Sequence, residues 1–350
     1  LEENTTVGNF LRDMFSMQLG SAEWVKHKDV FEKSLNMKDD ILLGPQRQQN
    51  RATEDVASIT DKNDLFENES DTDWTLPVNR EWVEAKIIAL KEKGNQAVSL
   101  QINGVDHYEG LEIDNGFDPS IPNSIPYTYA KANEALIDQA VSSADEAQKK
   151  WSEESVEKRS EIMLKIAQKI REKRGELIAI MMQDAGKIIP ESDAEITEAI
   201  DFAEYYARGY ELHDDISDLK CDSQGVCLIT PPWNFPFAIP AGGVFAALMT
   251  GSAVILKPAP ETILTARYLA EICWEAGVPK DVLQFVVCDD NPTGTKLVKD
   301  QRIKSIVLTG ATSTARLFRE FRPDINLYAE TGGKNTLYVS AMSDHDLAIR

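Results

Sequence analysis

Two side chains that suit catalysis stand in segments that directly follow short apolar runs. The first is Asn234, within the sequence PPWNFP at residues 231–236, after the apolar run 226–230. Three prolines in six residues force an extended backbone. An asparagine amide held in this way can donate to a developing oxyanion. The segment is also compatible with a rigid turn whose asparagine caps the following helix, and taken alone it favours that turn.

The second candidate is Glu330, which follows the run 326–329 in the sequence AETGGKN. A carboxylate beside two glycines can move and meet water, as a general base must. The glycines would also let a flat ring approach the backbone. The motif therefore suits a base at a site that binds a planar group.

Two further segments suit a nucleotide. Lys257 follows the run 253–256, where a lysine can bind ribose hydroxyls or neutralise phosphate, although a solvated strand end is the plainer interpretation. Gly310 follows the run 305–309 and precedes a predicted helix, 313–321, whose free N–H groups would suit a pyrophosphate. An ordinary turn with a serine or threonine cap is the alternative there. The GxGxxG fingerprint is absent from the sequence, so any dinucleotide must be held in another way.

The elements that position these residues alternate in type. Helical patterns lie between the apolar runs, at 237–249, 262–276, 293–299 and 313–321, and a further apolar run covers 282–287. Buried strands separated by helices predict an α/β fold with a doubly wound parallel sheet. Ligands of such sheets bind at the carboxyl ends of the strands, where all four segments are expected to lie.

The N-terminal half is mainly helical in pattern. Apolar residues recur at helical spacing in 79–93, 130–151, 156–184 and 193–210, Gly186 is placed to end the third of these, and 97–102 alternates like a strand. The proline-rich stretch 114–127 predicts a boundary. Residues 1–75 are polar and irregular, with a helical pattern at 9–19, and we assign them to an N-terminal arm; residues 76–350 form the second part.

Composition excludes several classes of partner. Acidic residues outnumber basic ones by 58 to 37, for a formal net charge of −21, so we expect neither a nucleic acid nor a stable membrane contact. No apolar run approaches the roughly 18 residues of a membrane span. The first residues show no signal pattern, which predicts a cytoplasmic location. Four cysteines and four histidines without ligand spacing predict free thiols and no metal site.

Taken together and in this order, PPWNFP, ILKPAPET, LTGATSTAR and AETGGKN resemble the aldehyde dehydrogenase superfamily from about Tyr127 to Arg350. The absence of an insertion before Glu330, with the stretches 68–73 and 79–82, is similar to the glutamate-semialdehyde (pyrroline-5-carboxylate) dehydrogenase of bifunctional proline-utilisation proteins. Residues 1–12 resemble the tail that follows the flavin-dependent proline dehydrogenase domain of those proteins.

The resemblance implies roles for individual residues. Asn234 would supply the oxyanion-hole amide and Glu330 the general base. Lys257 would bind the adenosine ribose, and Gly310 with the following helix would face the pyrophosphate. The remaining implied positions are Phe235 at the aldehyde channel, Thr230, Pro231 and Trp233 beside the cofactor cleft, and Gly332 on the nicotinamide side.

Three departures from the family pattern stand out. Pro260 replaces a glutamate that often makes a second ribose contact, and Ala311 replaces a serine that often touches phosphate. The family's nucleophilic cysteine lies a few dozen residues after Glu330, and the sequence ends at Arg350. We do not expect the cysteines that are present to replace it, namely Cys221, Cys227, Cys273 and Cys288.

We therefore predict the cofactor-binding portion of an NAD-dependent glutamate-semialdehyde dehydrogenase, homo-oligomeric when intact, with NADP not excluded. FAD is expected only if a proline dehydrogenase domain precedes this segment. The alternatives are a dehydrogenase for another aldehyde and a non-catalytic dinucleotide-binding module.

Overall fold

The computed structural model describes residues 9–15, 17–38, 47–56, 65–209, 222–333, 336, 338–344 and 346. The chain forms two compact units, residues 1–48 and 49–350. The described part of the first unit contains the helices α1 (Phe10–Asp13) and α2 (Ala22–Asn36), capped by Asn9 and Ser21. The helical pattern predicted at 9–19 thus extends over four residues, and α2 was not predicted. Neither helix buries a described side chain, so no core favours a longer α1.

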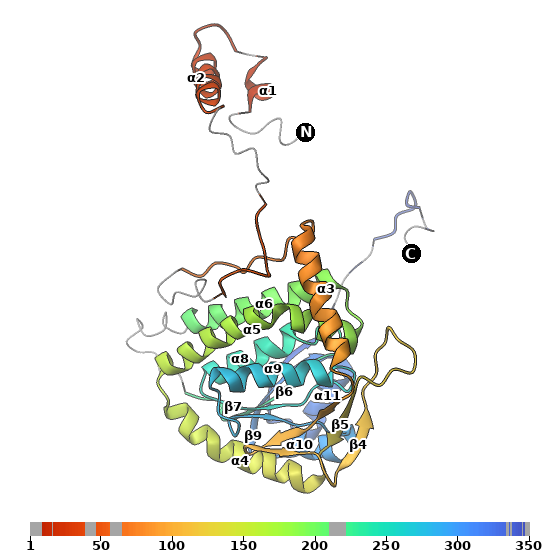
Figure 1. Ribbon diagram of the computed structural model, residues 1–350. Helices are drawn as coiled ribbons and strands as arrows, with labels where there is room; N and C mark the ends of the chain where they lie inside the picture. The colour runs from red at the N-terminus through yellow and green to blue at the C-terminus, as the bar shows by residue number, and fades with distance from the viewer. Residues whose placement is uncertain are drawn as a thin grey trace. The chain divides into compact units, whose positions relative to one another are not determined.

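The second unit is built on a sheet whose parallel part confirms the doubly wound α/β prediction (Figure 1). Within residues 65–209 and 222–333, seven strands form the order β10-β9-β6-β7-β8-β2-β3. The parallel strands are β6 (Val226–Thr230), β7 (Ala253–Leu256), β8 (Leu283–Phe285), β9 (Ile303–Gly310) and β10 (Asn326–Thr331). The antiparallel strands β2 (Leu100–Ile102) and β3 (Val105–His107) extend the sheet beyond β8.

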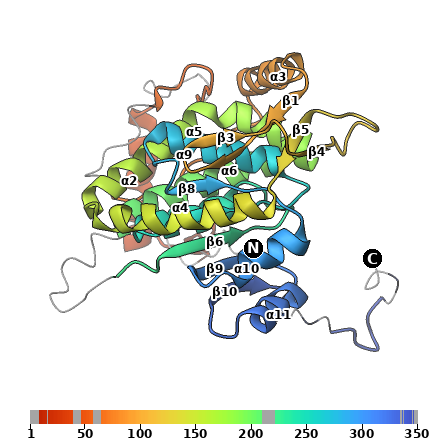
Figure 2. The same ribbon diagram turned by 90° about the horizontal axis from the view of Figure 1, so that it is seen from below.

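Helices cover both faces of this sheet, as Figures 1 and 2 show. On one face lie α8 (Ala238–Met249) and α9 (Ile263–Ala276), with α5 (Val156–Ala185) and α6 (Ile189–Gly209) packed over them. The other face carries α4 (Glu134–Glu153), α10 (Thr295–Lys299), which follows the short turn η3 (Asp290–Gly294), and α11 (Thr312–Phe321). The chain crosses from one face to the other after β8, so the strand order changes direction between β6 and β9.

A smaller sheet lies beside the large one. Within the same described ranges it has the order β1-β5-β4, from β1 (Gln96–Val98), β5 (Tyr127–Lys131) and β4 (Glu112–Asn115). The single strand predicted at 97–102 is therefore two strands in different sheets, separated at Ser99. The helix expected from residue 130 begins at Glu134, because β5 pairs with both neighbours and Asn133 caps α4.

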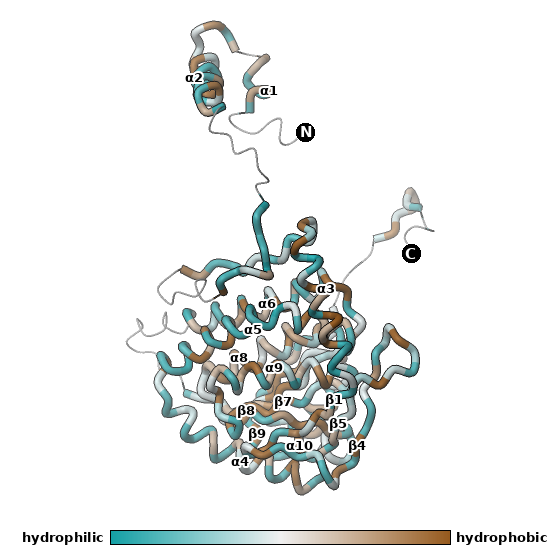
Figure 3. The backbone as a smooth tube through the Cα atoms, in the orientation of Figure 1, coloured by the Kyte–Doolittle hydropathy of each residue, from teal (hydrophilic) through white to brown (hydrophobic). Residues whose placement is uncertain are grey.

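Two helices agree closely with the sequence patterns. α3 (Pro77–Glu92) covers most of 79–93, and α5 ends where Gly186 adopts φ +67°, a left-handed conformation that glycine takes without strain. The strands and the inner faces of the helices share one apolar core. Figure 3 shows apolar residues concentrated in the central strands and in α8, whereas the chain that leads into α3 is largely hydrophilic.

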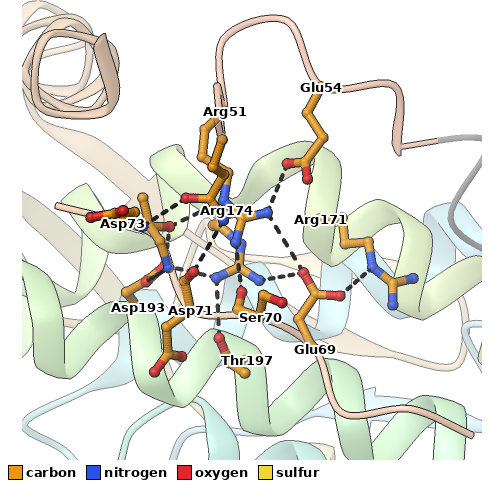
Figure 4. Close-up of polar contacts among 12 residues, drawn as sticks. Arg51, Glu54, Glu69, Ser70, Asp71, Asp73, Arg171, Arg174, Asp193 and Thr197 are labelled. Atoms are coloured by element: carbon orange, nitrogen blue, oxygen red, sulfur yellow. Dashed lines mark hydrogen bonds and ion pairs between the residues drawn. The ribbon is translucent and has the colours of Figure 1, made fainter. Parts of the chain in front are cut away.

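Buried ion pairs hold that hydrophilic chain against α5 and α6 (Figure 4). Glu69 accepts hydrogen bonds from Arg171 at 2.8 Å and from Arg174 at 2.7 Å. Arg174 also donates to Asp193 at 2.7 Å, and Asp193 accepts from the backbone N–H of Thr72 at 2.6 Å. The compact unit accordingly begins at Gln49, whereas composition placed the end of the arm at residue 75.

Removing the guanidinium group of Arg174 from this network should strongly destabilise the second compact unit. Arg174→Met leaves Asp193 and Glu69 with one buried partner fewer each, and we expect a loss of about 3 kcal/mol or more in the free energy of unfolding by urea. Lys149→Met removes an exposed ion pair with Glu146 and should cause no measurable loss. Equal, small losses for the two variants would show that the network is not the anchor.

A second buried carboxylate joins three elements. Asp184 of α5 accepts a hydrogen bond from the hydroxyl of Tyr127 at 2.7 Å. It also accepts from the backbone N–H of Thr265 at 2.7 Å and from the Thr265 hydroxyl at 2.8 Å, near the start of α9. Burial raises the pKa of Asp184 from 3.8 to about 6, because the charged form loses its hydration.

This pKa predicts a pH dependence of stability. The folded protein binds the Asp184 proton more tightly than the unfolded chain, so the contribution is present below about pH 4 and is lost as the pH rises through about 6. Asp184→Asn retains an acceptor without titrating. The wild-type free energy of unfolding, measured relative to this variant, should therefore fall by up to roughly 3 kcal/mol between pH 4 and pH 7. Parallel curves for the two proteins would contradict the assignment.

Candidate active site and cofactor cleft

The four segments singled out in the sequence lie at the carboxyl ends of the parallel strands of the large sheet. Thr230 of β6 pairs with Leu308 of β9, and Glu330 of β10 pairs with Thr309 of β9. Lys257 follows β7 and donates its backbone N–H to the carbonyl of Ile229 at 3.0 Å. All these positions lie at the carboxyl ends of parallel strands, beside the point where the strand order reverses. Open α/β sheets bind their ligands at this point.

Thr230 and Lys257 lie at the carboxyl ends of the neighbouring parallel strands β6 and β7. The hydroxyl of Thr230 donates to the carbonyl of Val307 at 3.2 Å, which joins β6 to β9. The ammonium group of Lys257 lies 3.5 Å from a carboxylate oxygen of Asp290, and the lysine side chain is 16% exposed. An ammonium group in this place can reach a ligand laid across the strand ends.

The start of α11 is open. Ala311 stands at the cap position, and no side chain of the described residues caps the helix, so the serine or threonine cap expected from the sequence does not form. A Cβ atom added to Gly332 would meet its nearest described neighbour, the Thr312 hydroxyl, only at 3.9 Å, and one added to Gly310 would meet Leu308 at the same distance. The uncapped N–H groups, with no close steric contact at either glycine, would suit the phosphates of a dinucleotide.

Asn234 does not cap α8. That helix begins at Ala238 without a cap from its own N-terminal residues, and the carboxylate of Glu195 accepts from the N–H groups of Phe237 and Ala238 at 3.0 and 3.1 Å. PPWNFP does form a turn, but the interpretation in which its asparagine caps the following helix is wrong. The side chain of Asn234 is left exposed at the strand end.

Asn234 and its neighbours border a cavity of about 390 Å³. Trp233 is 55% exposed and Phe235 is 40% exposed, and both face this space. The opposite wall comes from the loop between α5 and α6, with Lys187, and from the first turn of α6, with Glu191. A cavity with aromatic and charged walls beside an amide donor suits a polar substrate of small size.

Glu330 lies within β10 rather than after it, since the strand continues to Thr331. Its side chain is exposed, and β10 is the outermost strand of the sheet within the described residues. The strand was predicted to end at residue 329 because an exposed edge strand lacks the apolar run that marks a buried one. The backbone pairing fixes Glu330 more firmly than a glycine loop would.

The described cysteines cannot act as nucleophiles. Cys227, Cys273 and Cys288 are buried, and burial raises the pKa of all three thiols, in Cys227 to about 11. A thiol of this kind remains protonated at neutral pH. Cys221 lies outside the described residues.

Lys187 and Glu195 escaped the sequence analysis although they touch the candidate catalytic segment. Lys187 donates to the backbone carbonyl of Asn234 at 3.0 Å and pairs with Glu195. Both come from the helical region before β6, where no local motif marks them. Asp290 was also missed. It follows β8, whereas Lys257 follows β7, so their proximity depends on the packing of the two strands.

In the part of the chain that the structure describes, no three histidine, cysteine or acidic side chains gather as metal ligands would. Over the same residues, every helix is too short or too polar to span a bilayer.

Comparison with known proteins gives consistent matches. Residues 115–350 match the family model described as "Aldehyde dehydrogenase family". A 1-pyrroline-5-carboxylate dehydrogenase of Staphylococcus haemolyticus is 34% identical over 304 residues, covering 81% of this chain and 58% of the relative. The chain thus spans little more than half the length of that curated relative.

Solved structures match as well. A 1-pyrroline-5-carboxylate dehydrogenase from Thermus with bound NAD has a TM-score of 0.73 and 29% identity, over 78% of this chain and 56% of that chain. Proline utilization A (PutA) from Bdellovibrio bacteriovorus, inactivated by N-propargylglycine, has a TM-score of 0.78 and 27% identity, over 95% of this chain and 34% of that chain.

Proposed function

Since residues 115–350 match its family model, the chain belongs to the aldehyde dehydrogenase family, and we propose that it is the cofactor-binding portion of an NAD-dependent dehydrogenase for glutamate γ-semialdehyde, the open form of 1-pyrroline-5-carboxylate. The observation that carries the proposal is that Asn234, Lys257 and Glu330 stand at the carboxyl ends of the parallel strands, beside the uncapped start of α11. The named relatives supply the choice of substrate.

The reaction requires a cysteine nucleophile, which the described thiols do not provide. We therefore use "the complete enzyme" for a protein in which this chain is joined to a segment that supplies that cysteine. When bound, NAD accepts a hydride from the substrate carbon. Lys257 would hold the ribose, and the N–H groups at the start of α11, with Gly310, would hold the pyrophosphate. Thr230, Pro231, Trp233 and Gly332 would border the nicotinamide half.

The chain's own residues would perform two chemical tasks. The amide of Asn234 would donate to the aldehyde oxygen while that oxygen gains negative charge during thiolate addition. Glu330 would take a proton from the water that releases the acid product. Phe235 would line the approach of the aldehyde, since it borders the cavity beside Asn234.

We also propose that the N-terminal arm belongs to a bifunctional proline-utilisation protein. The match to proline utilization A covers 95% of this chain, whereas the match to the Thermus dehydrogenase covers 78%. The additional coverage supports a shared segment upstream of the dehydrogenase portion. FAD would be a cofactor of the protein only if a proline dehydrogenase domain accompanies that segment.

The test of this function is a pre-steady-state experiment on the complete enzyme. Glu330→Gln should spare formation of reduced cofactor more than hydrolysis, because the first step needs the thiolate and the oxyanion donor rather than the base. Mixing with glutamate γ-semialdehyde should give a burst of reduced cofactor near one equivalent and then slow turnover. If both phases keep their wild-type rates, Glu330 is not the base.

We infer that Asp290, beside Lys257, favours NAD over NADP. Asp290 lies beside the ammonium group, in a position to accept from a ribose hydroxyl in place of the glutamate that Pro260 replaces. A 2′-phosphate would bring further negative charge to Asp290, at a cost of about 1 kcal/mol per charge pair at 4 Å in water.

Titration calorimetry of this chain should therefore show NAD⁺ binding about tenfold more tightly than NADP⁺. Asp290→Asn should reduce that preference several-fold. Asp106 lies on the distant strand β3 and forms a comparable ion pair with Arg267 of α9 at 3.4 Å. Asp106→Asn removes that pair and should leave the preference for NAD⁺ unchanged. A wild-type chain that binds both cofactors equally would rule out Asp290 as the discriminating group.

A further inference from the structure

One buried carboxylate on α6 holds both ends of the segment that carries Asn234. Glu195 is 1% exposed, and one of its oxygens accepts from the N–H groups of Phe237 and Ala238. Its other oxygen pairs with the ammonium group of Lys187. The carboxylate therefore satisfies the first N–H groups of α8, at the positive end of that helix, and holds Lys187 at the same time.

Lys187 extends this contact to the other end of the segment. Its ammonium group donates to the backbone carbonyl of Asn234 at 3.0 Å and lies 4.3 Å from the centre of the Phe235 ring. The lysine side chain is 11% exposed and borders the cavity of about 390 Å³. The residues from Asn234 to Ala238 are thus fixed at their first and last positions by a single ion pair.

We propose that Lys187 and Glu195 are positioning residues that set the place of the Asn234 amide, an inference that rests on the proposed function. An oxyanion donor is effective only when its position is fixed before the charge develops. The prolines around Asn234 restrict the backbone angles, but they do not attach the segment to the body of the protein. Burial of Phe237 in the core holds the C-terminal end of the segment, and the ion pair adds directional contacts at both ends, from the loop before α6 and from α6 itself.

The pair is poorly explained by stability alone. A buried ion pair gains little net free energy, because the desolvation of both charges offsets their attraction. An apolar pair would fill the same space, but it could not accept from the two N–H groups and donate to the Asn234 carbonyl. These directional contacts all end on the segment that carries the oxyanion donor.

The test uses the complete enzyme with the variants Lys187→Met, Glu195→Gln and the double variant. The lysine variant loses the donor to Asn234, and the glutamate variant keeps an acceptor for the N–H groups while losing the charge. Each should lower kcat by on the order of 10- to 100-fold, the effect of misplacing a reacting group by about 1 Å. The double variant should be little worse than the more damaged single variant, because the two residues act as one unit. Lys187→Arg should restore part of the loss.

Two further measurements separate positioning from loss of folding. The dissociation constant of NAD⁺ should stay within about twofold of the wild type, because the pair lies on the aldehyde side of Asn234. Lys93→Met removes an exposed pair with Glu176, between α3 and α5, and should leave kcat unchanged. All assays are run at least 15 °C below the melting temperature of each variant.

Asn234→Ala serves as the reference. A collapse of kcat in Asn234→Ala, with normal kcat in Lys187→Met and Glu195→Gln, would overturn the positioning role and leave the proposed function intact. Normal kcat in Asn234→Ala would instead contradict the proposed function itself. A lowered melting temperature with normal kcat in the two variants would show that the pair is structural.

Discussion

The position of the segment that carries Asn234 depends on α6, and two buried carboxylates on different sides of α6 fix that helix. Asp193 and Glu195 are two residues apart, so they point to nearly opposite sides of the helix. Asp193 binds Arg174 of α5 and Thr72 of the segment before α3. Glu195 binds the start of α8 and Lys187. A shift or rotation of α6 would break contacts on both sides, so the helix holds the segment of Asn234 in a fixed relation to the sheet.

The second constraint is the order of the strands. The five parallel strands lie in the order β8-β7-β6-β9-β10. When these five strands are numbered from 1 to 5 along the chain, the order is 3-2-1-4-5, which is typical of dinucleotide-binding sheets. The reversal between β6 and β9 separates the helices on either side and leaves the carboxyl ends accessible. The chain lacks a GxGxxG turn, and we propose that the uncapped start of α11 after Gly310 binds the pyrophosphate in its place.

The sequence predicted the parallel strands well because a buried parallel strand is a continuous apolar run between helices. From those runs, the meeting of Asn234, Lys257, Gly310 and Glu330 followed by the geometry of parallel sheets. The predictions failed where the sequence carries no periodic signal. β10 is an exposed edge strand, so its end was placed before Glu330, and the split at Ser99 depends on pairing with two different sheets.

The contacts that hold the Asn234 segment could not be predicted either, because they join residues that lie far apart in the sequence. Glu195 lies 42 residues before Phe237, and Lys187 lies 47 residues before Asn234. Neither residue stands in a motif, and their role appears only when α6 is packed on α8. Capping by Glu195 also decided against the helix-cap interpretation of Asn234, which the local sequence had favoured.

Amide hydrogen exchange of this chain, with and without saturating NAD⁺, measures directly whether the carboxyl ends of the parallel strands form the cofactor cleft. We expect slower exchange with NAD⁺ in residues 230–235, 257–262 and 310–315. We expect no change in β2 and β3, at the side of the sheet far from β9 and β10. Protection confined to other surfaces, or none at NAD⁺ concentrations that saturate the calorimetric signal, would contradict the assignment of this edge as the cofactor cleft.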